Sequence, residues 1–218
     1  MKPLLTLADL ARNPADFATP LRMATGEQIS LRPLIPSDGE RLTRFLMGLS
    51  PESRRLSTFS GYDRATAQAL CDAIARYDKL RLAVVETDKA EESIVGLMEF
   101  SFDLTGGDLS RYANYGIGLN QKSDCRFGPT LADGWQNRGL GSRLLPPLWQ
   151  IARAFGRSRV ILWGGVLADN SRAIRYYAKN GFHHAGRFVS GDGQECCDMI
   201  LSLETDTMDR ARTVESIR

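Results

Sequence analysis

The stretch from residue 136 to 142 carries the residue types that bind a phosphate group. It follows an apolar segment and leads into an apolar helical pattern, and Gly139 and Gly141 let the backbone at this turn approach a ligand closely. The helix that begins there presents unpaired N–H groups, on which its dipole places partial positive charge. Arg138 adds a full positive charge and a forked donor. The stretch therefore predicts a pyrophosphate cradle made of Gln136, Asn137, Arg138, Gly139, Leu140, Gly141 and Ser142.

Two common nucleotide sites fit this stretch poorly. The dinucleotide-binding fingerprint needs a third glycine, and Leu144 occupies that position. A nucleoside triphosphate P-loop needs a Gly-Lys-Ser/Thr sequence, which is missing. A different nucleotide-binding enzyme is thus a disfavoured alternative.

A second block, residues 170–182, predicts a helix that ends at Gly181. With both blocks the chain resembles the GNAT superfamily of N-acetyltransferases, which pairs a Q-x-x-G-x-G turn with an N-x-x-A-x-x-x-Y-x-K-x-G-F helix. The matching residues are Gln136, Gly139 and Gly141 in the turn, and Asn170, Ala173, Tyr177, Lys179, Gly181 and Phe182 in the helix. The resemblance extends over residues 29–203.

Strands interleaved with helices predict a single α/β sheet domain. The resemblance implies a mixed, mostly antiparallel sheet flanked by helices, in which two parallel strands, 127–132 and 160–167, splay apart to admit acyl-CoA. We expect an N-terminal extension over residues 1–24, a GNAT-like domain over 25–204 and a charged C-terminal tail over 205–218.

Further elements follow from apolar spacing and turn residues. Thr6 can cap a helix over 7–12, Asp38 can cap another helix, and Ser50-Pro51 opens a turn. The remaining expectations are a linker after the first helix, strands over 28–35, 80–87, 93–102, 112–119 and 195–203, a helix over 63–77 and a loop over 104–111.

Prolines depart from the family pattern at two places. Pro129 lacks the backbone N–H that would bond a neighbouring strand. The separation of the two parallel strands tolerates this loss if position 129 faces the opening between them. Pro146 and Pro147 predict a kink in the helix after Gly141.

The resemblance also assigns contacts to acetyl-CoA, the implied cosubstrate. Backbone groups of Thr130 and Leu131 would bond the pantetheine amides, and donors over 137–142 would hold the pyrophosphate. Asn170 would meet the cofactor arm, and Tyr177 would bind near the sulfur.

An amine is protonated at neutral pH, so its attack on a thioester needs a group that removes a proton. The resemblance implies that Tyr177 donates a proton to the departing sulfur; packing in the core is the alternative. Glu99 is the candidate base, because it shares an apolar strand face with Val95 and Leu97, where burial would raise its pKa. Asp133 is a weaker candidate, better explained as a turn residue, and many family members relay the proton through water.

Composition fits one intracellular domain. The chain has 218 residues and a formal net charge of +2, which demands no nucleic-acid partner. Its four cysteines show no C-x-x-C spacing and none lies near either motif, so reduced thiols in the cytoplasm are expected. No signal peptide or membrane span is indicated, and His183-His184 have no third ligand that would suggest a metal site.

The sequence therefore predicts an acetyl-CoA-dependent N-acetyltransferase that acts by direct attack in a ternary complex. The acceptor stays open between polyamine, amino acid, aminoglycoside and protein lysine; Arg54 and Arg55, near Phe59 and Tyr62, either recognise an anionic acceptor or form a solvated face. The alternatives are a non-catalytic acyl-CoA-binding module and an enzyme that uses a longer acyl-CoA. A homodimer is common in the family.

Overall fold

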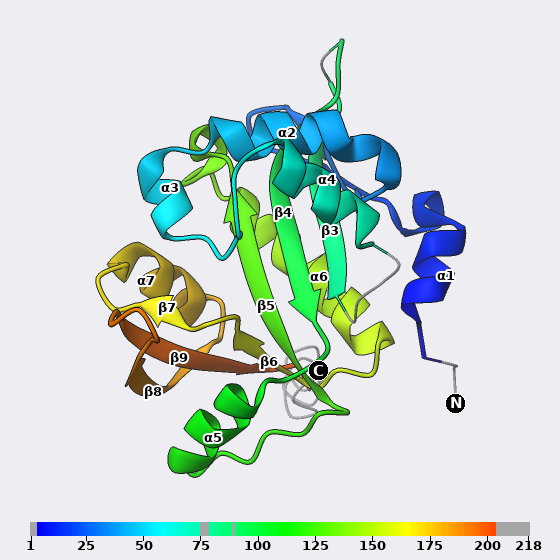
Figure 1. The fold of residues 1–218 in the computed structure, drawn as a ribbon. Coiled ribbons are helices and arrows are strands. Elements are labelled where there is room, and N and C mark those ends of the chain that lie inside the picture. Colours follow the sequence, from blue (N-terminus) through cyan, green and yellow to red (C-terminus); the bar gives the residue numbers. More distant parts are fainter. Residues whose placement is uncertain (1–3, 75–78, 89, 204–218) are drawn as a thin grey trace, which may run out of the picture.

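A mixed sheet forms the centre of the protein in a computed structural model, which describes residues 4–74, 79–88 and 90–203 (Figure 1). Its strands are β1 (Thr19–Arg22), β2 (Gln28–Pro33), β3 (Lys79–Glu86), β4 (Ser93–Ser101), β5 (Asp124–Leu131), β6 (Arg159–Leu162), β7 (Val166–Leu167), β8 (His183–Val189) and β9 (Glu195–Ser202). They follow the order β1-β2-β3-β4-β5-β6-β9-β7, with β8 on β9. Only β5 and β6 pair in parallel among these described strands. The predicted fold class is confirmed.

Helices cover both faces of the sheet. They are α1 (Leu7–Arg12), α2 (Gly39–Gly48), α3 (Pro51–Arg55), α4 (Arg64–Asp72), α5 (Gly106–Asn114), α6 (Leu140–Ala154) and α7 (Ser171–Lys179), with short 3-10 turns at Pro14–Phe17, Pro36–Asp38 and Asp133–Trp135. Figure 1 shows α2 and α4 in front of β3 and β4, and α6 behind the sheet. The apolar faces of these helices bury two separate core clusters against the strands.

The parallel pair separates halfway along its length. Pairing ends where Phe127 of β5 faces Leu162 of β6, although β5 continues to Leu131. Beyond Leu162, Gly164 and Gly165 adopt φ of +72° and +71°, a left-handed conformation that ends the strand. The expected strand over 160–167 is therefore two short strands, and β7 pairs with β9 instead of β5. The opening lies between β5 and this bend.

Pro129 faces the opening. The Phe127 carbonyl accepts from Trp163 N–H at 2.9 Å across the β6 side, and Ala132 N–H donates to the Val95 carbonyl on the β4 side at 2.9 Å. Because backbone groups alternate along a strand, position 129 faces the same side as Phe127. The missing N–H of Pro129 thus costs no ladder bond to β4. Pro146 and Pro147 lie inside α6, which continues to Ala154, and Pro146 is exposed. The predicted kink stays a prediction.

Several boundary predictions were wrong. The expected linker contains β1, which pairs antiparallel with β2. The predicted loop over 104–111 contains most of α5, whose first turn is fixed by a capping box between Thr105 and Asp108. The predicted strand over 112–119 begins inside that helix, where Tyr112 is buried, and β8 was missed.

Three helix predictions had mixed outcomes. Thr6 caps α1 as expected. Asp38 makes no side-chain cap for α2; its carboxylate instead accepts from Arg32 at 2.7 and 2.8 Å and from the Ile35 N–H at 3.0 Å. The helix expected over 63–77 is α4, which ends at Asp72; residues 75–77 lie outside the described residues, as does the tail over 205–218.

Candidate active site

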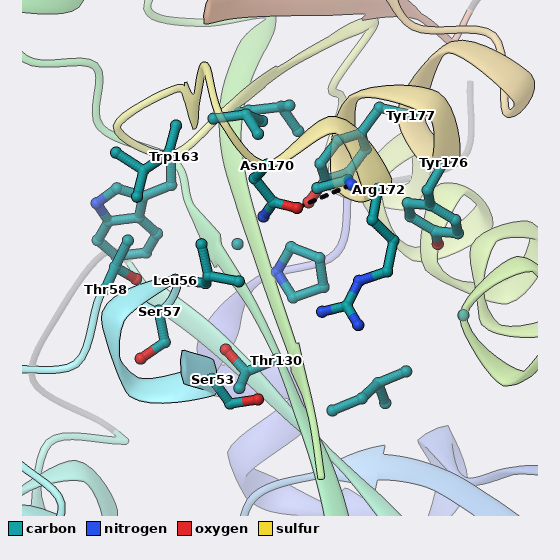
Figure 2. A pocket seen from close by; sticks show the side chains of 18 of the residues that line it. Ser53, Leu56, Ser57, Thr58, Thr130, Trp163, Asn170, Arg172, Tyr176 and Tyr177 are labelled. Carbon is teal, nitrogen blue, oxygen red and sulfur yellow. Dashed lines mark hydrogen bonds between the residues drawn. The ribbon is translucent and has the colours of Figure 1, made fainter. Parts of the chain in front are cut away.

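A cavity of about 450 Å³ lies at the separated ends of β5 and β6. Its walls come from β5, the bend after β6, the loop after α3, the start of α6 and the first turns of α7. Figure 2 shows side chains from these segments pointing toward one space. Residues far apart in the sequence, such as Ser53, Thr130 and Tyr177, therefore meet at this cavity.

The cradle has the backbone that its sequence predicts. Gly139, the N-cap of α6, has φ of +79°, and no side chain caps the helix. Asn137 also has a positive φ, of 58°, although it is not glycine. A Cβ at Gly141 would lie 3.1 Å from the Tyr176 hydroxyl. The N–H groups at the start of α6 are thus left for a ligand, which is the arrangement that suits a phosphate.

Gln136 ties the cradle to two other walls. Its side-chain amide donates to the Ser53 hydroxyl and to the Leu131 carbonyl, both at 3.0 Å. Asn137, Gly139, Gly141 and Ser142 also line the cavity, whereas the Leu140 side chain is fully buried in the core. Gln136 and Leu140 therefore hold the turn in place.

Arg138 does not lie among the residues that line the cavity. Its guanidinium forms an ion pair with Glu27, which lies between β1 and β2, and stacks 4.5 Å from the centroid of the Trp135 ring. The expected contribution of a full free charge to the cradle is therefore not seen: Glu27 neutralises it.

Thr130 and Leu131 line the cavity in different ways. By the alternation set out above, the peptide groups of Leu131 face the opening, and its carbonyl already accepts from Gln136. The peptide groups of Thr130 face β4, so Thr130 reaches the cavity through its side chain. The Leu131 N–H is thus the backbone donor that fits the expected pantetheine contact.

The start of α7 forms the opposite wall. The Asn170 side chain caps this helix by accepting from the Ala173 N–H at 3.1 Å, which leaves its amide nitrogen toward the cavity (Figure 2). Tyr177 is 8 % exposed, packs edge-on against Phe182, and makes no hydrogen bond to another described residue. Burial raises the pKa of Tyr177, so its hydroxyl is a proton donor and not a base.

Tyr176 both packs and lines the cavity. Its hydroxyl reaches the cradle at Gly141. Burial raises its pKa as well.

Glu99 is buried on the sheet face covered by α2 and α4, and it is not part of the cavity lining. Burial raises its pKa as expected, and the positive charge of Arg81 offsets part of that rise. Arg81 Nε lies 2.8 Å from Glu99 Oε1. Leu97 shares this face, but Val95 packs in the cluster on the other face, since a bulge between Val84 and Val85 shifts the register.

The weaker candidates have structural roles. Asp133 accepts from the Ser50 N–H at 2.9 Å and from the Ser50 and Ser53 hydroxyls at 2.7 Å. Burial acts to raise the pKa of Asp133, but these hydrogen bonds outweigh it and lower the pKa. Arg54 donates to the carbonyls of Met47 and Leu49.

Cys196 corrects one expectation, because it lines the cavity from β9. The position of Cys196 beside the cavity could not be predicted from its spacing in the sequence, because it depends on the pairing of β7 with β9. The thiol is buried, and burial raises its pKa, which disfavours the thiolate. All four cysteines are free.

The sequence also missed the end of the cavity away from the cradle. Trp163 and Thr58 lie together there, as Figure 2 shows, and a Cβ at Gly128 would contact both. A lone tryptophan after an apolar strand was the available signal. Arg55 lies at the same cavity, but its charge is shared with Glu52 and Asp169.

Comparison with known proteins agrees with this geometry. The model of the acetyltransferase (GNAT) family matches residues 52–182, and the chain belongs to this family. An acetyltransferase of Pseudomonas aeruginosa is 28% identical over 131 residues, which are 60% of this chain and 63% of the relative. The match thus spans less than two thirds of the relative's length.

Solved structures share the fold. The GNAT domain of S. lividans PAT has a TM-score of 0.63 at 20% identity, over 87% of this chain and 98% of that one. AAC(6')-Ib in complex with ribostamycin and coenzyme A has a TM-score of 0.61 at 18% identity, over 80% and 93%. A spermidine N-acetyltransferase chimera from Vibrio cholerae and hSSAT has a TM-score of 0.58 at 18% identity, over 80% of this chain and 95% of that one.

Within the described part of the chain, every helix is too short or too polar to cross a membrane.

Proposed function

We propose that this protein transfers an acetyl group from acetyl-CoA to an amine by direct attack in a ternary complex. One observation carries the proposal: an uncapped helix start and a protonated tyrosine with a free hydroxyl, Tyr177, line the same cavity between splayed strands. Family membership supports it.

The residues present suit acetyl-CoA. The start of α6 offers N–H donors to the pyrophosphate, and the Leu131 N–H and Asn170 amide lie along the opening where the pantetheine arm would run. When bound, acetyl-CoA supplies the thioester that an amine attacks.

Tyr177 then acts as proton donor to the departing sulfur. Its raised pKa keeps the proton in place at neutral pH, and no other described residue competes for its hydroxyl. Glu99 stays the proposed acceptor of the amine's proton. Because Glu99 lies behind the lining, opposite Gly128 in the sheet register, this transfer needs a water between the carboxylate and the amine.

The test measures thiol release when acetyl-CoA is mixed with a panel of amines: spermidine, free amino acids, an aminoglycoside and a lysine peptide. Release that depends on one class of amine is expected. Binding of acetyl-CoA without release under any amine would favour the non-catalytic module.

A second arm tests direct attack. Acetyl-CoA alone should release no stoichiometric burst of thiol, and Cys196→Ser should keep the activity of the parent. A burst that Cys196→Ser abolishes would replace direct attack with a covalent route through Cys196.

A further inference from the structure

Three charged residues are found among the described residues that line the cavity: Arg55, Arg172 and Asp192. Two of them already have partners. Arg55 pairs with Glu52 at 3.0 Å and with Asp169 at 3.1 Å, and Asp192 accepts a hydrogen bond from Ser190. Arg172 is different: it is exposed at the cavity, and none of the hydrogen bonds or ion pairs of the described chain includes it.

The effect of Arg172 on neighbouring charged groups is weak. Its charge helps to lower the pKa of Glu52 at longer range, after the hydrogen bonds and charge of Arg55. Glu52 already accepts from Arg55 at 3.1 and 3.0 Å. The Arg172 guanidinium therefore remains available to a ligand.

Its place on the helix is unfavourable for the protein alone. Arg172 is the second residue of α7, whose N-terminal end carries the positive pole of the helix dipole. A cation there is repelled by that pole, and no carboxylate pairs with it. A locally unfavourable residue that lines a cavity suggests a role in binding.

Arg172 and the cradle line the same cavity. Residues four apart share a helix face, so Arg172 lies one turn from Tyr176 on the same side of α7. The Tyr176 hydroxyl reaches Gly141 in the cradle. Figure 2 shows the Arg172 side chain extending from α7 into the cavity beside Tyr176.

The cradle itself lacks a free cation. Arg138 is paired with Glu27, as described above, so the cradle offers neutral N–H groups alone. Coenzyme A carries several phosphate charges, and a guanidinium binds phosphate oxygens with two parallel donors. We propose that Arg172 binds a phosphate of coenzyme A from the α7 side of the cavity. The inference rests on the proposed function.

Calorimetric titration of the full chain with coenzyme A, and with pantetheine, which has no phosphate, tests this proposal. Arg172→Met should raise the Kd for coenzyme A by about ten- to a hundredfold, as for loss of a charge-assisted hydrogen bond, and leave the Kd for pantetheine unchanged. The Kd of Arg172→Lys should lie between those of the parent and of Arg172→Met, because lysine keeps the positive charge but lacks the two parallel donors of the guanidinium. The salt dependence of Kd should also become shallower in Arg172→Met.

Arg175→Met is the matched control. It removes the same charge from an exposed position of α7 that is outside the cavity lining, and its Kd should stay at the parent value. Thermal unfolding of each variant checks that it folds, and Arg172→Met should melt no lower than the parent.

Three results would overturn the proposal: an unchanged Kd for coenzyme A, an equal loss for pantetheine, or an altered KM for an anionic amine with Kd unchanged. The last would assign Arg172 to the acceptor's own anion. Failure of the parent protein to bind coenzyme A at all would instead overturn the proposed function.

Discussion

Arg81 and Glu99 form a buried ion pair across β3 and β4, with Arg81 Nε 2.8 Å from Glu99 Oε1. Each side chain is only 7% exposed, and the Nη1 atom of Arg81 has no hydrogen-bond partner in the described chain. A buried pair of this kind need not stabilise the fold more than an apolar pair would, but removing one partner leaves an isolated buried charge.

We therefore predict that Arg81→Met destabilises the protein by about 3–5 kcal/mol at neutral pH. Without Arg81, burial raises the pKa of Glu99 further above its unfolded value. A carboxyl group with a raised folded pKa leaves stability unaffected below its unfolded pKa, and stability is lost as pH rises from there through the folded pKa. Urea unfolding should thus show a larger loss at pH 8 than at pH 5.

The double variant Arg81→Met, Glu99→Gln is the control, because it removes both charges. Its stability should depend less on pH than that of Arg81→Met. An equal loss for Arg81→Met at both pH values would show that Glu99 does not titrate in this range.

Tyr177→Phe should lower kcat by about a hundredfold, the usual scale for one positioned proton donor. Its Kd for coenzyme A should change little, and so should its melting temperature, because the hydroxyl makes no hydrogen bond to a described residue. Steady-state rates with the responsive amine check this, beside calorimetry. Tyr176→Phe serves as comparison, and an equal fall in kcat there would remove the special role of Tyr177.

The helical half of the site was predictable because its signals are local. Asn170 caps α7, Gly139 adopts the left-handed turn before α6, and Tyr177 follows at fixed helical spacing. Each of these depends on neighbours within a few residues. The capping box at Thr105 is equally local, because both of its residues lie within four positions of the sequence.

Partners distant in the sequence could not be predicted. Glu27 neutralises Arg138 across 111 positions, and Arg81 reaches Glu99 only through strand register. Cys196 joins the cavity because β9 lies between β6 and β7. Such contacts depend on sheet order, which single-chain periodicity does not specify.

Gly141 lies close to Tyr176, so a larger residue at position 141 should disturb the Tyr176 ring. A Cβ at position 141 would lie 3.1 Å from the Tyr176 hydroxyl and 3.2 Å from its ring, so Gly141→Ala must push that ring. We expect the Kd for coenzyme A to rise about tenfold, equal to about 1.4 kcal/mol. Adding Tyr176→Leu should recover binding, since the smaller side chain leaves room. No recovery would mean that the new Cβ obstructs the ligand directly.

Trp163 should control the acceptor and not the cofactor. It lines the cavity beside Thr58, away from the cradle, and lies over Gly128 with 3.5 Å between its Cβ and a Cβ placed there. Lys79 Nζ and Arg126 Cζ lie 5.1 and 4.8 Å from its ring centroid, so the ring is held from outside the cavity.

Removing the ring opens this end of the cavity but leaves the α6 start intact. Trp163→Ala should therefore change the KM for the amine severalfold, while the Kd for coenzyme A stays at the parent value. The KM for the amine in Trp163→Phe, which keeps a flat ring, should lie between those of the parent and of Trp163→Ala. Steady-state kinetics over the amine panel and calorimetry measure both quantities on the same preparations. A larger change in the Kd for coenzyme A than in the KM for the amine would contradict this prediction. It would show that Trp163 contacts the cofactor and not the acceptor.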